Sequence, residues 1–276
     1  MNFAYRRTYR GPLQALVLDW AGTLVDFGSF APTAVFLRLF AEQGVPITAA
    51  EARSGMGLKK RDHLALIVGL PAVAQRWREV HGSAPAREEL DRLFTAFVPM
   101  QIECIKEYAT PIPGMLETIA DARQRGLKIG TTTGYTRPIM EDLLPAAAAH
   151  GFVPDSCVCS DEVPAGRPAP WMSYRVATEL GVFPMEALVK VGDTLVDIEE
   201  GLKPGMWTVG IALTGNLLGL TEPEVASLTP DELRTRRAAI AAQFHQAGAH
   251  YVIDSIAALP ALLASIEARL QVGEKP

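Results

Sequence analysis

The stretch LVLDWAGTLVD, residues 16–26, joins an apolar run to an acidic residue and then to a turn of small residues. The run has the composition of a buried strand, and Asp19 stands where that strand would end. A carboxylate in this place could attack phosphorus with one oxygen and hold a hard cation with the other. The structural alternative is a strand-end Asp that only caps a turn.

Further along the chain, similar apolar runs of strand length alternate with segments of helical period. This alternation is typical of a doubly wound α/β fold, so we predict a mostly parallel, Rossmann-like sheet flanked by helices. The expected strands lie at residues 13–19, 127–133, 155–160, 188–193, 207–213 and 250–254.

The interval from about residue 33 to 100 breaks this rhythm, because it has no convincing strand pattern and is rich in helix formers. It follows the first strand and its loop directly, which would place it over the carboxyl edge of the sheet, where such folds bind ligands. We therefore predict a core domain of residues 1–30 and 101–276 and a helical cap domain of residues 31–100. ATPIPGM, residues 109–115, is the expected return hinge.

Composition narrows the class of protein. The chain has 276 residues, a formal net charge of −5 and no basic cluster of the kind that binds nucleic acid, so we expect no nucleic-acid partner. No apolar run approaches the roughly 20 residues of a membrane span, and residues 1–12 lack a signal core, so we expect no membrane partner and a cytoplasmic location. The three cysteines complete no zinc set and are expected to be thiols.

A second acidic stretch, VGDTLVDIEEG, follows the expected strand at residues 188–193. A helix that starts near Thr194 would bring Asp193 and Asp197 to its positive end, at the same sheet edge as Asp19. Oxygen ligands from Asp19 and Asp193 would suit Mg²⁺. The alternative is an ordinary helix cap, which is the commonest use of an Asp in this position.

Two more strand ends carry groups that suit a phosphoryl ligand. GTTTGYTR, residues 130–137, offers a Thr hydroxyl and exposed backbone N–H groups. PAGRPAP, residues 164–170, offers Arg167 on a loop stiffened by prolines, where a cation could neutralise a phosphate. A lone loop arginine is otherwise a solvated surface residue.

The expected cap contains ARSGMGLKKRDHL, residues 52–64, in which Lys59, Lys60 and His63 follow a flexible glycine-containing stretch. A lysine near another cation or in an apolar pocket can be a free amine near neutral pH and form an imine with an aldehyde. The alternative is a solvated basic run on a helix.

These stretches, in this order, resemble the haloacid dehalogenase superfamily, whose members use an Asp nucleophile, a Thr or Ser, a basic residue and an acidic pair with Mg²⁺. The basic residue is usually lysine there, so Arg167 is a departure. The superfamily's phosphatases carry a second Asp two residues after the nucleophile, which protonates the leaving alkoxide. Here that position is Ala21, so a phosphatase would lack its acid.

Together with the cap stretch, DWAGTLVDFGSFAP and DEVPAGRPAPWM resemble the phosphonoacetaldehyde hydrolase family of that superfamily. The resemblance implies C–P bond hydrolysis of a small phosphonate, phosphonoacetaldehyde, to acetaldehyde and orthophosphate, in 2-aminoethylphosphonate degradation. It implies an aspartyl phosphate on Asp19 and an imine on Lys60, which fits the family's MGLxK pattern better than Lys59 does. It also implies proton transfer by His63 and a homodimer formed through the cap domains.

The same resemblance assigns the remaining site residues. It implies that Mg²⁺ is held by Asp19, the backbone carbonyl of Ala21 and Asp193, with Asp197 orienting the site. The substrate-binding positions would be Gly22, Met56, Thr133, Gly134, Tyr135 and Arg167. The rival hypotheses are a magnesium-dependent phosphatase of the same superfamily and a non-catalytic phosphate-binding relative.

Overall fold

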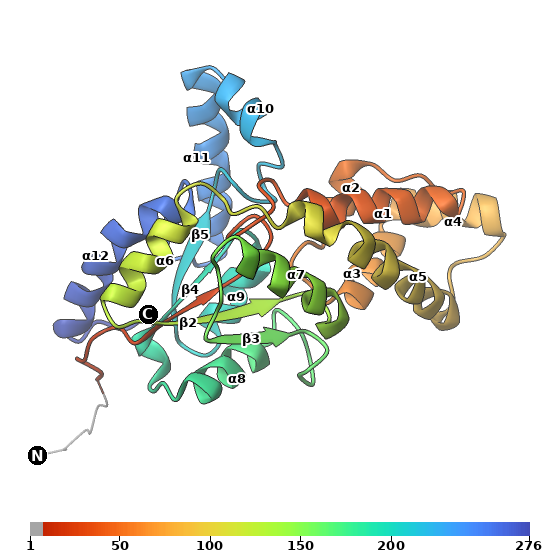
Figure 1. The fold of residues 1–276 in the computed structure, drawn as a ribbon. Coiled ribbons are helices and arrows are strands. Elements are labelled where there is room, and N and C mark those ends of the chain that lie inside the picture. Colours follow the sequence, from red (N-terminus) through yellow and green to blue (C-terminus); the bar gives the residue numbers. More distant parts are fainter. Residues whose placement is uncertain (1–7) are drawn as a thin grey trace, which may run out of the picture.

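A computed structural model describes residues 8–276 and centres on a six-stranded sheet in which every neighbouring pair is parallel (Figure 1). The strand order is β3-β2-β1-β4-β5-β6, and each strand lies within one of the apolar runs that the sequence indicates. The predicted fold class is therefore confirmed. In chain order the strands are β1 (Ala15–Leu18), β2 (Lys128–Thr133), β3 (Ser156–Cys159), β4 (Leu188–Gly192), β5 (Trp207–Ile211) and β6 (Tyr251–Ile253).

The central strand β1 shows why the sheet is buried on both faces. Successive side chains point to opposite faces, so Leu16 and Leu18 join one apolar cluster while Ala15 and Val17 join another. The first cluster includes residues of α6 (Met115–Gln124), α7 (Arg137–Ala149) and α12 (Leu259–Gln271), and the second includes residues of α8 (Trp171–Leu180). Helices on both faces explain why β1 is apolar throughout.

The first five helices after β1 form a separate group beyond the carboxyl edge of the sheet, before the chain returns to α6 and β2 (Figure 1). The chain enters this group through Asp26, whose carboxylate accepts the backbone N–H groups of Phe30 and Ala31 at 2.8 and 3.0 Å and so satisfies the start of α1. The five helices are α1 (Phe30–Glu42), α2 (Ala49–Arg53), α3 (Lys60–Gly69), α4 (Pro71–His81) and α5 (Arg87–Ile105).

This helical group occupies the place predicted for the cap. Helix α5 runs past residue 100 to Ile105, so the domain limits at 30/31 and 100/101 stay a prediction, and residues 1–7 of the expected core domain lie outside the described residues. Within the group, Phe36 stacks on Phe97 with ring centroids 4.7 Å apart and Phe40 lies edge-on to Trp77. These rings belong to the same apolar cluster as Leu16 and Leu18 of β1, so the cap packs continuously onto the core.

A two-helix arm follows β5 and projects away from the sheet (Figure 1). It consists of α10 (Glu222–Ser227) and α11 (Pro230–Gln246), each opened by a capping box. Among the described residues, no helix has the length and apolar character needed to cross a membrane. The remaining elements are α9 (Leu195–Leu202) and the short 3₁₀ helices Lys106–Tyr108, Met185–Ala187 and Ile256–Ala258.

Candidate active site

The candidate site lies where the three central strands end. Asp19 directly follows β1, Thr133 is the last residue of β2, and Asp193 directly follows β4. The strands that follow β1 in the chain are added on one side of it, β2 and β3, and then on the other, β4 to β6. Open α/β sheets bind their ligands at the carboxyl edge where the strand order reverses in this way.

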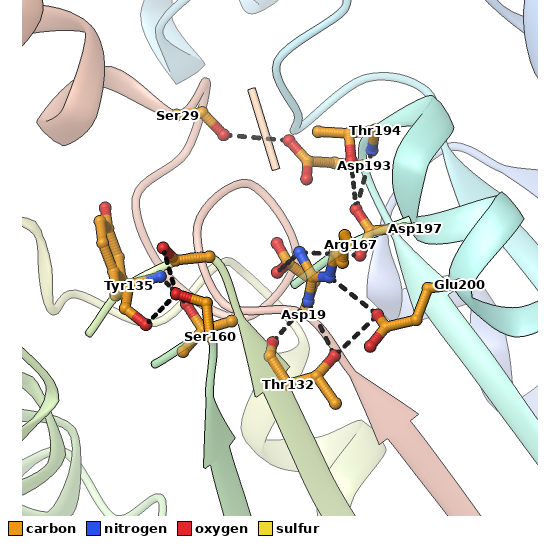
Figure 2. Close-up of polar contacts among 12 residues, drawn as sticks. Asp19, Ser29, Thr132, Tyr135, Ser160, Arg167, Asp193, Thr194, Asp197 and Glu200 are labelled. Carbon is orange, nitrogen blue, oxygen red and sulfur yellow. Dashed lines mark hydrogen bonds and ion pairs between the residues drawn. The ribbon is translucent and has the colours of Figure 1, made fainter. Parts of the chain in front are cut away.

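Three carboxylates meet at this edge. Asp19, Asp193 and Asp197 each offer one oxygen, and these oxygens all lie within 4.8 Å of one another. Oδ2 of Asp193 accepts a hydrogen bond from Ser29 Oγ at 3.0 Å (Figure 2). It also accepts one from the Asn216 backbone N–H at 2.7 Å, while the buried Oδ1 has no partner among the described residues. A buried, unpaired carboxylate oxygen beside other carboxylates fits a hard divalent cation such as Mg²⁺.

The surroundings shift the pKa values of these three carboxyl groups in different directions. Burial raises the pKa of Asp193 well above its usual value, and the nearby charges of Asp19 and Asp197 raise it further. Burial also raises the pKa of Asp19, with Arg167 opposing that shift. For Asp197 burial is outweighed by Arg167 and Lys190, which hold its pKa below the usual range. A cation between Asp19 and Asp193 would offset their repulsion.

Arg167 connects this cluster to the sheet (Figure 2). Its guanidinium is only 1% exposed, with Nη1 2.6 Å from Asp19 Oδ1 and 3.0 Å from Asp197 Oδ1. Nε donates to Glu200 at 2.8 Å, and Nη2 donates to the carbonyl of Thr132 at 2.6 Å. The alternative of a solvated surface arginine is therefore wrong, and the fork is fixed in one orientation.

Behind Arg167 lies a second buried cation, Lys190, in the middle of β4. Its Nζ is 2.9 Å from Asp197 Oδ1 and 2.9 Å from Glu200 Oε2, and it donates to Thr132 Oγ1 at 2.8 Å. Lys190, Glu200 and Thr132 have no role among the predictions from the sequence. A lysine inside the otherwise apolar run LVKVGD was the available signal, because such a residue needs a buried carboxylate partner.

The loop that follows β2 packs in close contact with the cap loop. A Cβ on Gly134 would lie 2.5 Å from the carbonyl oxygen of Leu58, so only glycine allows the cap loop to come this close. Thr133 Oγ1 accepts the backbone N–H of Tyr135 at 3.1 Å, and the Tyr135 ring is buried with its hydroxyl unpartnered among the described residues. Burial raises the pKa of Tyr135 well above its usual value, so this phenol stays neutral.

Lys60 is the first residue of α3 and is 3% exposed, which excludes a solvated basic run at this position. Its Nζ lies 4.9 Å from the ring centroid of Tyr135 and 5.8 Å from that of Phe36, and no described carboxylate forms an ion pair with it. Burial lowers the pKa of Lys60 to about 8, although Asp19 opposes the shift. Lys59 is half-buried and does not line the site cavity.

His63 lies three residues further along α3, fully buried against Phe36 with ring centroids 4.2 Å apart. Its Nε2 is 2.8 Å from the carbonyl oxygen of Ala52, so Nε2 carries the proton and Nδ1 the lone pair. Burial, together with the charge of Lys60, lowers the pKa of His63 well below its usual value. The residue is therefore a neutral imidazole close to the lysine.

The cavity between cap and core has a volume of about 20 Å³, enough for about one water molecule. The cap is thus closed on the core. Gly22, His63 and Asp197 lie behind the lining, and a Cβ on Gly22 would come within 2.2 Å of Asp193 Oδ2. The predicted residues that line the cavity are Asp19, Ala21, Met56, Lys60, Thr133, Gly134, Tyr135, Arg167 and Asp193, joined by Ser29, Pro32, Gly57 and Thr194.

Comparisons with known proteins identify the family of this chain. Residues 13–203 match the family model of the haloacid dehalogenase-like hydrolases. A phosphonoacetaldehyde hydrolase from Syntrophobacter fumaroxidans is 48% identical over 274 residues and aligns with 99% of both chains. Another, from Hahella chejuensis, is 48% identical over 276 residues, which is 100% of this chain and 94% of that one.

Solved structures of related proteins share the fold of this chain. The crystal structure of a phosphonoacetaldehyde hydrolase-like protein from Oleispira antarctica superposes with a TM-score of 0.98 at 40% identity and covers all of both chains. A β-phosphoglucomutase from Clostridium difficile superposes with a TM-score of 0.68 at 16% identity, covering 94% of this chain and 99% of that one, so it shares the fold. The chain belongs to the haloacid dehalogenase-like hydrolases, and within them to the phosphonoacetaldehyde hydrolase family.

Proposed function

We propose that the protein hydrolyses the C–P bond of phosphonoacetaldehyde to acetaldehyde and orthophosphate, using an imine on Lys60 and an aspartyl phosphate on Asp19. The observation that carries this proposal is a buried lysine that has no carboxylate partner within residues 8–276 and lines the same closed cavity as Asp19. Full-length relatives named phosphonoacetaldehyde hydrolase support the choice of substrate.

Imine formation comes first, because direct C–P cleavage would expel a carbanion. With a pKa of about 8, Lys60 is a free amine in about a tenth of molecules at pH 7. This amine adds to the aldehyde carbon and a water molecule leaves, which gives an iminium next to the carbon that bears phosphorus. We assign proton transfer around this nitrogen to the neutral imidazole of His63, three residues further along α3.

Phosphoryl transfer then follows in line. A carboxylate oxygen of Asp19 attacks phosphorus, and the electron pair of the C–P bond moves into the iminium, so that the product on Lys60 is an enamine. Arg167 holds Asp19 in place and, with Thr133, faces the oxygens of the phosphoryl group. In this way the lysine nitrogen takes up the electrons, and Ala21 needs no acidic side chain.

Two hydrolytic steps restore the enzyme. Protonation of the enamine carbon gives an ethylidene imine, which water cleaves to acetaldehyde and free Lys60. A second water cleaves the aspartyl phosphate to orthophosphate and free Asp19. Since imine formation released one water, the net reaction consumes one water per substrate.

We further propose Mg²⁺ as the cofactor, held by Asp19, the carbonyl of Ala21 and Asp193, with Asp197 behind them. Oδ1 of Asp193, which no described residue pairs with, and the three converging carboxylates support this assignment. When bound, the ion supplies charge that stabilises a phosphoryl group next to an anionic nucleophile.

The wider biological assignment rests on the same family membership. We propose a place in 2-aminoethylphosphonate degradation, a cytoplasmic location and a homodimer formed through the cap helices. Light scattering coupled to size exclusion tests the last of these. A monomer at micromolar concentration would contradict it.

The test of the reaction is simultaneous assay of acetaldehyde and orthophosphate from phosphonoacetaldehyde, with Mg²⁺ and with chelator. Para-nitrophenyl phosphate serves as the control substrate. Equal, Mg²⁺-dependent yields of both products with little control hydrolysis support the proposal. Strong hydrolysis of the control without acetaldehyde would instead establish a phosphatase, and inertness toward both would favour a non-catalytic relative.

A further inference from the structure

The segment between β5 and α10 contacts both halves of the site. Its residue Asn216 is 7% exposed, and its backbone N–H donates to Asp193 Oδ2 at 2.7 Å. The side chain of the same residue faces the cap, where Oδ1 accepts from Arg53 Nη1 at 3.1 Å and Nδ2 donates to the Arg53 carbonyl at 3.4 Å. One residue therefore touches a core carboxylate with its backbone and the cap with its amide.

Arg53 connects Asn216 to the cap loop that leads to Lys60. It ends α2, directly before the loop that carries Met56 and leads to Lys60. Besides Asn216, its Nη1 donates to the carbonyl of Gly28 at 2.7 Å, and its guanidinium carbon lies 4.9 Å from the ring centroid of Phe30. The arginine thus joins the lysine-bearing loop to the linker through which the chain enters the cap.

The cap loop is in direct contact with the core in this state. A Cβ on Gly57 would lie 2.5 Å from Thr194 Oγ1, and one on Gly166 would lie 3.0 Å from Lys59 Cβ. With a cavity of about 20 Å³, substrate enters only if these surfaces separate. Because Arg53 and Asn216 lie on opposite sides of that separation, their hydrogen bonds break whenever the cap opens.

We propose that Asn216 is a positioning residue and that the Arg53–Asn216 pair is a latch that holds the cap closed with Lys60 against the core. The latch acts through Lys60 and Asp193 without touching the reacting atoms. Its kinetic test rests on the proposed function, whereas its exchange test does not. The hydrogen bonds of the latch stabilise the closed state relative to the open one. Only the closed state is reactive, because an open cap separates the amine of Lys60 from the carboxylate of Asp19.

Asn216→Ala is the informative variant, since it deletes both amide contacts and keeps the backbone N–H that binds Asp193. We expect hydrogen exchange of the amides of residues 54–60 to accelerate, while exchange in the sheet stays unchanged. We expect kcat/KM for phosphonoacetaldehyde to fall on the order of ten- to a hundredfold, as for loss of charged hydrogen bonds. KM should carry part of that loss.

Arg53→Ala should give the same local exchange, and the double variant should be no worse than the more impaired single variant. Arg78→Ala, an exposed arginine of the cap helix α4, is the matched control and should behave as the parent within about twofold. If Arg53→Ala does not fold, Arg53→Lys replaces it, because it keeps the charge and loses the fork.

The outcomes separate the two proposals. Parent-like exchange at residues 54–60 in Asn216→Ala, or fully additive effects of the two substitutions, would overturn the latch. Faster exchange throughout the chain would show a purely structural role and also overturn it. A parent protein that does not release acetaldehyde refutes the proposed function, yet the exchange experiment still decides whether the latch exists.

Discussion

Two fully or nearly fully buried lysines lie on opposite sides of the site, and their surroundings differ completely. Lys190 on the core is 0% exposed and pairs with Asp197 and Glu200, each at 2.9 Å. Lys60 on the cap is 3% exposed, has aromatic rings near its Nζ and forms no ion pair among the described residues. The core surrounds its lysine with carboxylates, whereas burial on the cap lowers the pKa of Lys60.

This difference matches the chemistry proposed for each side. A phosphoryl group and an attacking carboxylate need fixed positive charge, which Arg167 and Lys190 provide through a network held by Thr132 and Glu200. An attacking amine needs to be neutral, which burial of Lys60 promotes. Because α3 of the cap helices carries Lys60, its amine is kept away from the carboxylates that pair with Lys190 in the core.

The largest effect is expected for removal of the amine. Lys60→Met should lower kcat/KM for phosphonoacetaldehyde by roughly 10⁴-fold or more, because no imine can form. Lys59→Met is the matched control and should retain most of the activity, since its side chain does not line the cavity. Steady-state kinetics of both variants, with borohydride trapping and peptide mapping, provide the measurement.

A label found on residue 59 in the parent protein would contradict this assignment. So would an active Lys60→Met variant. Lys60→Arg tests whether charge alone suffices, because it keeps a cation and cannot form the imine at neutral pH. We expect it to be as inactive as the methionine variant.

The next effect concerns stability. Lys190→Met leaves Asp197 and Glu200 buried with one cation fewer, which should lower the free energy of unfolding by about 3–5 kcal/mol. Lys60→Met removes a buried cation that forms no ion pair in the part of the chain that the structure describes, so we expect little loss of stability or a small gain. Urea unfolding of the two variants beside the parent measures the difference. Equal losses would show that the two lysines are not distinguished by pairing.

The sequence was sufficient to predict the fold and the convergence of the candidate carboxylates for identifiable reasons. Each strand is a short apolar run bounded by turn residues, and parallel strands bring their carboxyl ends to one edge, so Asp19 and Asp193 could be placed together without coordinates. The alternatives for Arg167 and Lys60 could not be excluded in this way. Their burial depends on which loops and helices pack over them.

The missed residues share a different cause. Lys190, Glu200 and Thr132 are connected only in three dimensions, across β2, β4 and α9. Asn216 and Arg53 are separated by 163 positions in the chain. No local pattern predicts such pairs, because each side chain reads by itself as an ordinary polar residue.

The smallest effect, and the one that tests the comparison most directly, is the pH dependence of Lys60. Only the free amine attacks the aldehyde, and burial lowers the pKa of Lys60 to about 8, so kcat/KM should rise about tenfold per pH unit below 8 and level off above it. The rate of cyanoborohydride-dependent labelling by acetaldehyde reports the same ionisation without C–P cleavage. A midpoint near 10.5 in both profiles would mean that Lys60 titrates like an exposed lysine, so that the cap does not depress its pKa. Agreement of both midpoints near 8 would instead assign the depressed pKa to the amine itself, whichever later step limits turnover.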